Sequence, residues 1–396
     1  MEKQTIRDRN LKGKRVLVRV DLNVTLEQGR ISDDGRLRAI VPTLQYLREQ
    51  GAMMILCSHL GRPDGRVVES MRLEPIGRRL SELMHEEVKY ITDCVGPKVD
   101  TAVNNLKPGE ILLLENLRFH PEEEQNDVEF ASSLASLAEV FVNDGFAVAH
   151  RAHASTEGVG HYLPSVAGLL MEKELRILGS LLMSPPRPLI VALGGAKVSD
   201  KIGVLEHFLD KVDTLLIGGG MAATFLKARG LSVGHSLVED NSLDVAHDIM
   251  SHAHEKGIPF LIPLDVVIAD AFEPDAKSRT VDVEDVPDGW YIMDIGHRTL
   301  DIFRAKASQG KTILWNGPMG VFEFPAFSRG TRELAAALGS LSGVTTVLGG
   351  GSTAEAVESL GLASRISHVS TGGGASLEFL EGKMLPGVGI LLDKEK

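Results

Sequence analysis

The sequence predicts an α/β protein of two domains built from βαβ units and parallel sheets. Apolar runs of about five residues alternate with segments of helical periodicity along the whole chain, a pattern typical of βαβ units. With 396 residues, the chain exceeds what one hydrophobic core usually supports, so we expect two domains. Ligands of open parallel sheets bind beyond the carboxyl ends of the strands, so the residues that follow each apolar run are the candidates for function.

The domain boundary is expected at a long amphipathic stretch that ends before Pro185-Pro186. No glycine cluster interrupts this stretch, and we interpret it as a helix over 166–184 that joins a domain of residues 1–165 to a domain of residues 185–380. The tail, residues 381–396, contains an apolar segment that can pack against another part of the chain.

The composition excludes several classes of protein. The formal net charge of −12 argues against a nucleic-acid partner, although local arginines can still attract a small anion. Two cysteines, Cys57 and Cys94, are too few for a disulfide framework or a zinc site. The charged start does not resemble a signal peptide, and no run of about 18 apolar residues predicts a membrane span. We therefore expect a cytoplasmic protein.

The first half carries arginine and histidine after its apolar runs, which we expect to be strands at residues 16–20, 53–57, 111–114 and 140–142. The residues after these runs include Asp21 and Asn23, then His59 and Arg62, then Arg118, then Arg151. Each arginine alone is as consistent with a solvated surface position as with a site. Together with His59 they predict a basic pocket for a small anion, since guanidinium groups bind oxyanions with two hydrogen bonds. Expected helices span residues 38–50, 74–85 and 129–138.

In the second half of the chain, four apolar runs are each followed by a glycine cluster. The runs at 189–193, 214–217, 345–348 and 366–370 lead into Gly194-Gly195, Gly218–Gly220, Gly349–Gly351 and Gly372–Gly374. Glycine permits a positive φ and a close approach of backbone N–H groups to a ligand. Each cluster alone can be an ordinary tight turn, but four in one domain predict a phosphate-binding or nucleotide-binding crevice. Expected helices span residues 201–211, 221–229, 242–256, 328–339 and 353–360.

Two lysines and a tryptophan-containing turn add to this second site. Lys197 and Lys201 are four residues apart at an expected helix start after a glycine turn, where they fit phosphate binding better than a solvated ion pair. Trp315-Asn316-Gly317-Pro318 ends a further strand, and Glu323 follows Asn316 by seven residues. This segment can be a simple turn, or Glu323 can accept hydrogen bonds from ribose hydroxyls.

Two loose dinucleotide fingerprints keep a second enzyme class open. Gly218-x-Gly220-x-x-Ala223, with Glu239 about twenty residues later, and Gly349-x-Gly351-x-x-Ala354 both follow expected strands. They permit an NAD-dependent dehydrogenase, although neither lies in the first βαβ unit. An anion- or nucleotide-binding sensor without activity is a third hypothesis. The sequence contains no Walker A motif, so a P-loop enzyme is not expected.

Over essentially its full length the chain resembles the phosphoglycerate kinase family. The resemblance rests on seven motifs in the family's order, which are Arg19-Val20-Asp21-Leu22-Asn23-Val24, Ser58-His59-Leu60-Gly61-Arg62-Pro63-Asp64-Gly65, Leu114-Glu115-Asn116-Leu117-Arg118-Phe119, Ala149-His150-Arg151-Ala152-His153, Leu193-Gly194-Gly195-Ala196-Lys197-Val198, Trp315-Asn316-Gly317-Pro318 and Ser370-Thr371-Gly372-Gly373-Gly374-Ala375-Ser376.

The resemblance implies a fold of two Rossmann-like three-layer αβα lobes with parallel sheets, joined by a hinge helix. It implies reversible in-line phosphoryl transfer from 1,3-bisphosphoglycerate to Mg-ADP, giving 3-phosphoglycerate and ATP in glycolysis and gluconeogenesis. The enzyme is then a monomer, and its C-terminal tail folds back on the N-terminal lobe.

By motif match, the triose-acid positions are Asp21, Asn23, Arg36, His59, Arg62, Arg118 and Arg151. The nucleotide and phosphate positions are Lys197, Lys201, Gly218, Gly219, Asn316, Pro318, Glu323, Gly349, Gly350, Gly351, Ser352 and Thr353. We expect Arg36, Lys197, Gly350 and Gly373 to act on the group in transit. Ser352 stands where the family usually carries an aspartate that helps to hold Mg²⁺, so the metal is expected to depend mostly on the nucleotide phosphates.

Overall fold

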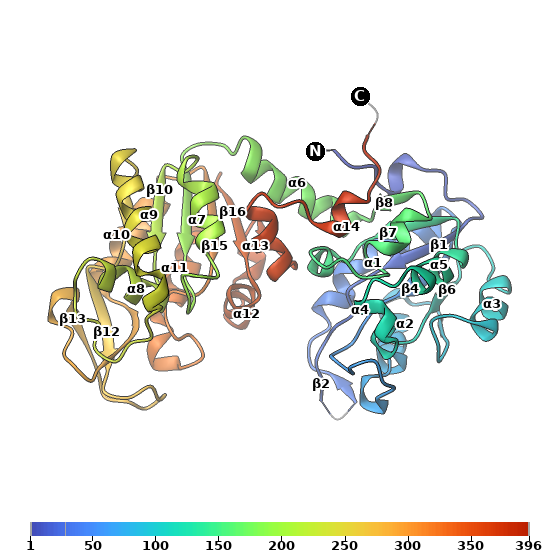
Figure 1. Ribbon diagram of the computed structural model, residues 1–396, viewed down its shortest axis with the longest axis horizontal. Helices are drawn as coiled ribbons and strands as arrows, with labels where there is room; N and C mark the ends of the chain where they lie inside the picture. The colour runs from blue at the N-terminus through green and yellow to red at the C-terminus, as the bar shows by residue number, and fades with distance from the viewer. Residues whose placement is uncertain (1, 28, 395–396) are drawn as a thin grey trace. The chain divides into compact units, whose positions relative to one another are not determined.

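The computed structural model describes residues 2–27 and 29–394, which form two compact units. The first unit comprises Met1–Gly179 and Met384–Lys396, and the second comprises Ser180–Lys383. Each contains a six-stranded sheet in which all strands are parallel (Figure 1). The predicted α/β fold with two lobes and parallel sheets is confirmed.

The sheet of the first unit has the strand order β5-β6-β4-β1-β7-β8. Its strands are β1 (Arg15–Arg19), β4 (Met53–Cys57), β5 (Val88–Tyr90), β6 (Ile111–Leu113), β7 (Val140–Asn143) and β8 (Ser165–Ala167). In the register of the centre, Leu17 of β1 pairs with Ile55 on one side and Phe141 on the other. The carboxyl ends of β4, β1 and β7 therefore lie at one edge of the sheet, which brings together the motifs that follow them.

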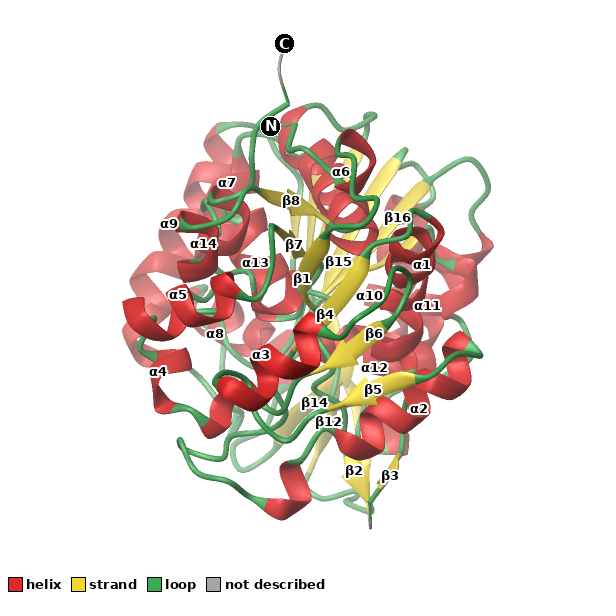
Figure 2. Cartoon of the chain, turned by 90° about the vertical axis from the view of Figure 1, so that its right-hand side faces the viewer, coloured by secondary structure: helices red, strands yellow, loops and turns green. Residues whose placement is uncertain are grey.

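Helices cover both faces of this sheet because its strands alternate two sets of apolar side chains. Val16 and Val18 pack in one cluster with residues of α1 (Gly35–Glu49) and α2 (Glu74–Met84). Leu17 packs in a second cluster with residues of α3 (Pro97–Asn104) and α5 (Val128–Ser136). Figure 2 shows α1 and α2 on one side of the sheet and α3 and α5 on the other. Burial on both faces explains why these strands read as continuous apolar runs.

Helix α1 begins three residues earlier than the sequence indicated. A short hairpin of β2 (Leu26–Glu27) and β3 (Arg30–Ile31) leads into it, and the helix starts at Gly35 rather than at residue 38. Arg36, one of the expected site residues, therefore lies in the first helical turn. The helical backbone of α1 therefore fixes the position from which the Arg36 side chain extends.

Helix α6 (Leu169–Met183) follows β8, so the expected helical start at residue 166 is wrong. Val166 is fully buried in the strand. The Oδ1 atom of buried Asp144, next to β7, accepts hydrogen bonds from the N–H groups of Leu170 and Met171 at 2.9 and 3.1 Å. Burial raises the pKa of Asp144 to about 6. The first N–H groups of α6 are thus satisfied by a carboxylate from the residue that follows β7.

The C-terminal segment is hydrogen-bonded within the first unit. The short helix α14 (Pro386–Gly389) places the Gly387 carbonyl 2.8 Å from Nδ2 of Asn143. The N–H of Leu392 donates to the Ser165 carbonyl of β8 at 2.9 Å. The buried ammonium of Lys3 donates to the Leu391 carbonyl at 2.8 Å, so both ends of the chain meet on β8.

The sheet of the second unit has the order β11-β10-β9-β15-β16-β17. Its strands are β9 (Leu189–Leu193), β10 (Thr214–Ile217), β11 (Phe260–Leu261), β15 (Thr312–Asn316), β16 (Thr345–Gly349) and β17 (His368–Val369). Trp315 packs on one face with residues of α10 (His297–Ala307), α11 (Arg329–Ser340) and α12 (Gly351–Ser359). Leu314, which points to the other face, is also fully buried. The remaining helices are α7 (Ile202–Leu209), α8 (Met221–Ala228), α9 (Leu243–Glu255) and α13 (Gly374–Leu380).

The second unit also contains an antiparallel sheet that the sequence did not indicate. Its order is β13-β12-β14, with β12 (Asp265–Ala269), β13 (Ser278–Asp282) and β14 (Tyr291–Ile295). Ala269 and Met293 of this sheet pack with Phe327 in a small core of their own. Among the described residues, no helix combines the length and the apolar character needed to cross a membrane.

Candidate functional sites

The first candidate site lies where β1, β4 and β6 end in the first unit. Asp21 is 6% exposed and pairs with the guanidinium of Arg36. Oδ1 of Asn23 accepts the Gly61 N–H at 2.9 Å, which ties the turn after β1 to the turn after β4. Arg118 is 4% exposed, and its Nη1 donates to the Gly61 carbonyl at 2.7 Å. The turns after β1, β4 and β6 are therefore joined by hydrogen bonds at Gly61.

His59 is the neutral member of this cluster. It is 4% exposed, and burial together with the positive charges of Arg19, Arg118, Arg151 and Arg36 holds its pKa well below the ordinary histidine value. Burial also lowers the pKa of the Arg118 guanidinium, although arginine remains charged in proteins. The site is thus a concentration of guanidinium charge that is only partly offset by Asp21, which pairs with Arg36, and by Glu124, whose Oε1 lies 3.2 Å from Nε of Arg118. Such a site suits a multiply charged anion.

The predicted residues differ in how tightly the structure holds them. Asp21, Asn23, Arg36, His59 and Arg118 are brought together by the contacts given above. Arg151, which follows β7, is half-buried with its Nε 3.4 Å from Nε2 of His150, and its charge acts on His59. Arg62 is exposed beside Gly61.

Sequence reasoning missed Arg19 as a member of the site. It is the last residue of β1, is 1% exposed, and its Nη2 lies 3.1 Å from Nδ1 of His59. The available signal was a charged residue inside a strand that is buried on both faces, where a charge is costly unless it is paired.

The glycine clusters of the second unit divide into two kinds. Gly194, Gly219 and Gly317 sit where the turns after β9, β10 and β15 press backbone against backbone. A Cβ on Gly219 would lie 2.5 Å from the Gly195 nitrogen, and one on Gly194 would overlap the Pro318 carbonyl. Gly218 is blocked by the Met319 sulfur. The tight-turn interpretation therefore accounts for these glycines without a ligand.

The other glycines leave their backbone open. A Cβ on Gly351 or Gly373 would meet nothing within 4 Å. Gly350, with φ of +89°, precedes α12, and Gly373, with φ of +52°, precedes α13. The first N–H groups of a helix lack partners and favour anions. The turns after β16 and β17 are thus the anion-binding candidates among the glycine clusters.

Lys201 is the buried cation of this unit. It is 8% exposed, and its ammonium donates to Oδ1 of Asn316 at 2.5 Å. Burial lowers the pKa of Lys201 to about 8, against the opposing pull of Asp200 and Glu381. The Nδ2 group of Asn316 is buried without a hydrogen-bond partner and lies beside Gly349 and Gly350. An amide donor and an ammonium therefore converge near the start of α12.

The expectation that Lys197 and Lys201 both lie at a helix start is correct for Lys201 and wrong for Lys197. Helix α7 begins at Ile202 with Lys201 as its N-cap, whereas Lys197 is exposed in the irregular loop before it. The two lysines therefore do not share a helix face. Thr353 is also buried, and its hydroxyl accepts the Gly317 N–H at 2.6 Å, so it joins two turns. Ser352, by contrast, is exposed in the first turn of α12.

A cavity of about 460 Å³ opens beside these turns. Of the residues predicted to bind the nucleotide, Gly219, Pro318 and Glu323 line this cavity and Gly218 does not. Its apolar walls were not predicted, because they come from the antiparallel sheet and neighbouring loops, and they include Leu237, Phe272, Tyr291, Met293 and Val321. Small residues on one side and apolar side chains on the other suit a flat ring system.

Glu239 is not placed as the ribose-binding acidic residue of a dinucleotide fold. Its two carboxylate oxygens accept from the hydroxyl and the N–H of Ser199 at 2.6 and 2.9 Å, which fixes the loop that carries Lys197. In a dinucleotide fold an acidic residue at this spacing binds the ribose. The geometry does not support the dehydrogenase hypothesis.

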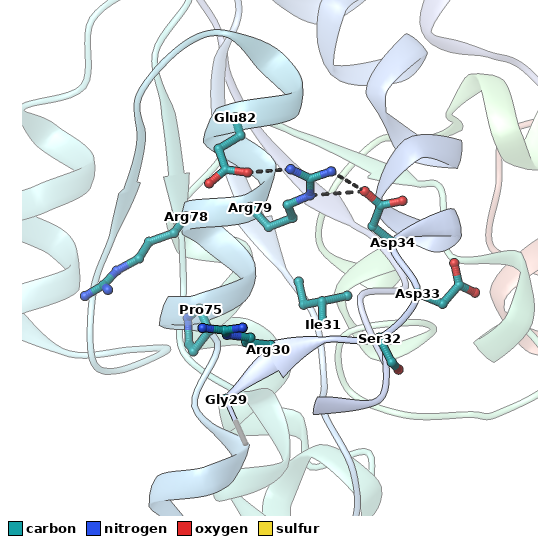
Figure 3. A pocket seen from close by; sticks show the side chains of 10 residues that line it. All are labelled: Gly29, Arg30, Ile31, Ser32, Asp33, Asp34, Pro75, Arg78, Arg79 and Glu82. Carbon is teal, nitrogen blue, oxygen red and sulfur yellow. Dashed lines mark hydrogen bonds and ion pairs between the residues drawn. The ribbon is translucent and has the colours of Figure 1, made fainter. Parts of the chain in front are cut away.

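A second hollow of about 460 Å³ lies between β3 and α2 in the first unit (Figure 3). Arg79 spans it and is held on both sides by Asp34 and Glu82. None of the predicted site residues lines this hollow, and its charges largely neutralise one another. It is a surface feature rather than part of either candidate site.

The side chains of the second unit also bear on how it could hold a metal ion. Within the described residues, no group of three or more His, Cys, Asp or Glu side chains could hold an ion. The exposed Ser352 hydroxyl and the open backbone of Gly351 fit an ion that arrives with phosphate oxygens of its own.

Comparisons with known proteins agree with one another. The family model described as phosphoglycerate kinase matches residues 6–383. The chain is 55% identical over 394 residues to the phosphoglycerate kinase of Moorella thermoacetica, covering all of both chains, and 56% identical over 400 residues to that of Chloroflexus aurantiacus, again with full coverage. Among solved structures, the Coxiella burnetii phosphoglycerate kinase has a TM-score of 0.89 at 42% identity, and the Pyrococcus horikoshii one has a TM-score of 0.83 at 34% identity, each with 98% of both chains covered.

Proposed function

Because the chain belongs to the phosphoglycerate kinase family and is a phosphotransferase of glycolysis, we propose that its two units divide the substrates. The first unit binds 3-phosphoglycerate or 1,3-bisphosphoglycerate, and the second binds ADP or ATP. The observation that carries this division is the cluster of arginines around neutral His59, which offers permanent positive charge to a small anion with two acidic ends.

In the first unit, Arg62, Arg118 and Arg151 bind the phosphate and carboxyl groups of the acid. Guanidinium groups suit this role because each presents several donors in a fixed plane. Asp21 and Asn23 hold the surrounding geometry, since Asp21 pairs with Arg36 and Asn23 binds the Gly61 N–H. His59 contributes a hydrogen bond.

In the second unit, the nucleotide base enters the 460 Å³ cavity, beside Gly219 and Pro318. Glu323, at the edge of this cavity, accepts the ribose hydroxyl protons. The phosphates then extend toward Lys201 and Asn316, whose partnerless Nδ2 group supports this placement. The N–H groups at the start of α12, from Gly349 to Thr353, complete the phosphate site.

The chemistry requires positioning and charge stabilisation rather than a covalent intermediate. The acyl phosphate of 1,3-bisphosphoglycerate is a reactive donor, and an oxygen of the ADP β-phosphate attacks in line. Arg36 and Lys197, with backbone amides near Gly350 and Gly373, stabilise the charge on the phosphoryl group in transit. No general base is needed because the attacking oxygen carries no proton to remove.

We propose that Mg²⁺ enters with the nucleotide. When bound it neutralises negative charge on the phosphates. Ser352 supplies a neutral oxygen at the helix start, a weaker ligand than a carboxylate. This proposal is supported by the exposure of Ser352 and by the lack of an acidic cluster among the described residues.

A coupled assay tests the proposed reaction directly. Purified protein should form ATP from ADP and 1,3-bisphosphoglycerate generated in situ, with a requirement for Mg²⁺. Binding of ADP without turnover would indicate the sensor hypothesis instead. Binding of NADH, with no effect of ADP, would overturn the assignment of the 460 Å³ cavity.

We further propose a cytoplasmic monomer in which ligand binding bends the chain at α6. Transfer requires the two bound substrates to meet, and water must be kept from the acyl phosphate. Small-angle scattering of the protein with neither, one or both ligands should give the smallest radius of gyration with both. An unchanged radius in the ternary complex would contradict bending, and a mass of two chains would contradict the monomer.

A further inference from the structure

A chain of buried polar groups leads from Glu123 to His59 in the first unit. Glu123 lies in the short helix α4 (Pro121–Glu124) and is 1% exposed. The hydroxyl of fully buried Ser155 donates to its Oε1 at 2.6 Å, and the Ser155 N–H donates to its Oε2 at 2.9 Å. Nε of Arg19 donates to the same hydroxyl oxygen at 2.8 Å. The arrangement is complete, because each oxygen of Glu123 and the hydroxyl of Ser155 have partners.

Arg19 is held by three contacts at once. Nε binds Ser155, Nη1 donates to the Val20 carbonyl, and Nη2 lies 3.1 Å from Nδ1 of His59. Since the guanidinium plane is rigid, its position at Ser155 fixes where Nη2 points. Burial raises the pKa of Glu123, and the nearby charge of Arg19 opposes that shift, so the Glu123 carboxylate partly offsets the charge of Arg19. A buried charge needs such a partner.

The contact between Arg19 and His59 determines the protonation of the ring. Arginine is only a hydrogen-bond donor, so Nδ1 of His59 must be the acceptor and carries no proton. The ring is then neutral with its proton on Nε2. This leaves Nε2–H as the one ring donor available to an anion in the site.

We propose that Glu123, acting through Ser155 and Arg19, is a positioning residue that fixes His59 as the neutral Nε2–H tautomer. His59 then gives the acid substrate one directed hydrogen bond, whereas the surrounding arginines supply the charge. The effect on substrate rests on the proposed function of the first unit, but the tautomer itself is a property of the free protein.

The test is long-range ¹H–¹⁵N NMR of the histidine rings in the full-length protein at pH 7, without ligand. The chain has 13 histidines, and the His59 signals are assigned by their loss in His59→Gln. The wild-type ring should show the pattern of a pure Nε2–H tautomer. In Ser155→Ala and Arg19→Lys, the Nδ1–H tautomer should become populated, because a single ammonium or an unanchored guanidinium no longer fixes Nδ1.

The variants distinguish an effect of side-chain geometry on His59 from an effect of lost charge or of a lost fold. Arg19→Lys keeps the positive charge and loses the planar geometry. Ser155→Ala avoids an unpaired buried charge, which makes it safer than Glu123→Gln if the latter fails to fold. Ser133→Ala and Glu129→Gln, both at exposed positions of α5, are the matched controls and should leave the His59 signals unchanged. Protonated Nδ1 in the wild type, or an unchanged tautomer in both Ser155→Ala and Arg19→Lys, would overturn the proposal.

Kinetics provide a second readout. Loss of one well-directed hydrogen bond to a charged substrate should raise KM for 3-phosphoglycerate about tenfold in Ser155→Ala. KM for ATP should stay unchanged, which a general loss of stability would not produce. If the tautomer changes as expected but 3-phosphoglycerate leaves the His59 signals unmoved in the wild type, the acid site is elsewhere and the positioning network still stands.

Discussion

If Lys201 holds the nucleotide phosphates as proposed, its buried ammonium should make nucleotide binding depend on proton uptake. Burial lowers its pKa to about 8 from an ordinary value of 10.5. A bound phosphate would favour the charged form and restore a higher pKa. At pH 8 about half of the free protein is neutral at Lys201, so binding of ADP should take up about 0.5 proton per nucleotide.

The same pKa sets the direction of the pH dependence. Because the lowered pKa describes the free protein, ADP affinity should be full well below pH 8 and should fall as the pH rises. From pH 8 to pH 9.5 the loss should be about 15-fold if phosphate restores the ordinary pKa. Isothermal titration calorimetry with Mg-ADP at pH 8, in two buffers of different ionisation enthalpy, measures the proton uptake directly.

Two substitutions make the measurement decisive. Lys201→Arg should remove the uptake because arginine is protonated throughout this range. Lys197→Arg is the matched control, since Lys197 is exposed, and it should keep the uptake of the wild type. Equal uptake in the wild type and Lys201→Arg, or a wild-type affinity that does not change between pH 8 and 9.5, would refute the placement of Lys201 at the phosphates.

Three further predictions follow from the sites. Arg36→Ala should lower kcat by about 100-fold or more with smaller changes in KM, whereas Arg151→Ala should mainly raise KM for 3-phosphoglycerate; pure KM effects in both would refute the division of roles. Ser352→Asp should lower the Mg²⁺ concentration for half-maximal rate, and superimposable Mg²⁺ titrations would show that this position has no metal role. Gly194→Ala should cost about 2 kcal/mol of unfolding free energy because its Cβ overlaps a carbonyl group, whereas Gly351→Ala, with open space around it, should keep its melting temperature.

The regular parts of both sheets could be predicted because their strands are buried on both faces. The runs at Met53–Cys57, Leu189–Leu193 and Thr214–Ile217 have the bounds that the sequence indicated. Their apolar character is continuous, and the turn residues that follow them are distinct. The motifs at the strand ends could then be placed together on the general rule for parallel sheets.

Helix α10 was missed because its cap comes from a distant strand. Its N-cap residue is Gly296, which offers no side chain. The carboxylate of Asp265, at the start of β12, accepts instead from the N–H groups of Arg298 and Thr299 at 3.1 and 2.8 Å. A local search for Ser, Thr, Asp or Asn before a helix cannot detect a cap some thirty residues away. The antiparallel strand β12, which supplies this cap, was missed with it.

The members of the first site that the sequence could not identify are those whose role depends on burial. Glu123 lies in a run of three glutamates, a pattern typical of a solvent-exposed surface. Of the three, only Glu123 is buried. Ser155 carries no distinctive pattern at all. Their partners come from three separate segments, so their function exists only once the chain has folded.

The candidate sites of the two units provide positive charge for an anion in different ways. The second unit presents backbone N–H groups at the starts of α12 and α13. It adds the buried ammonium of Lys201, whose pKa is lowered by burial. The N–H groups cost little in the free protein, because helix ends carry their partial charge without an ion to desolvate. The first unit presents full guanidinium charges, and two of them, Arg19 and Arg118, are nearly fully buried. Buried guanidinium groups require fixed partners, and Glu123 meets that requirement for Arg19. In the network proposed above, the same carboxylate also sets the direction of the His59 ring donor, through Ser155 and Arg19.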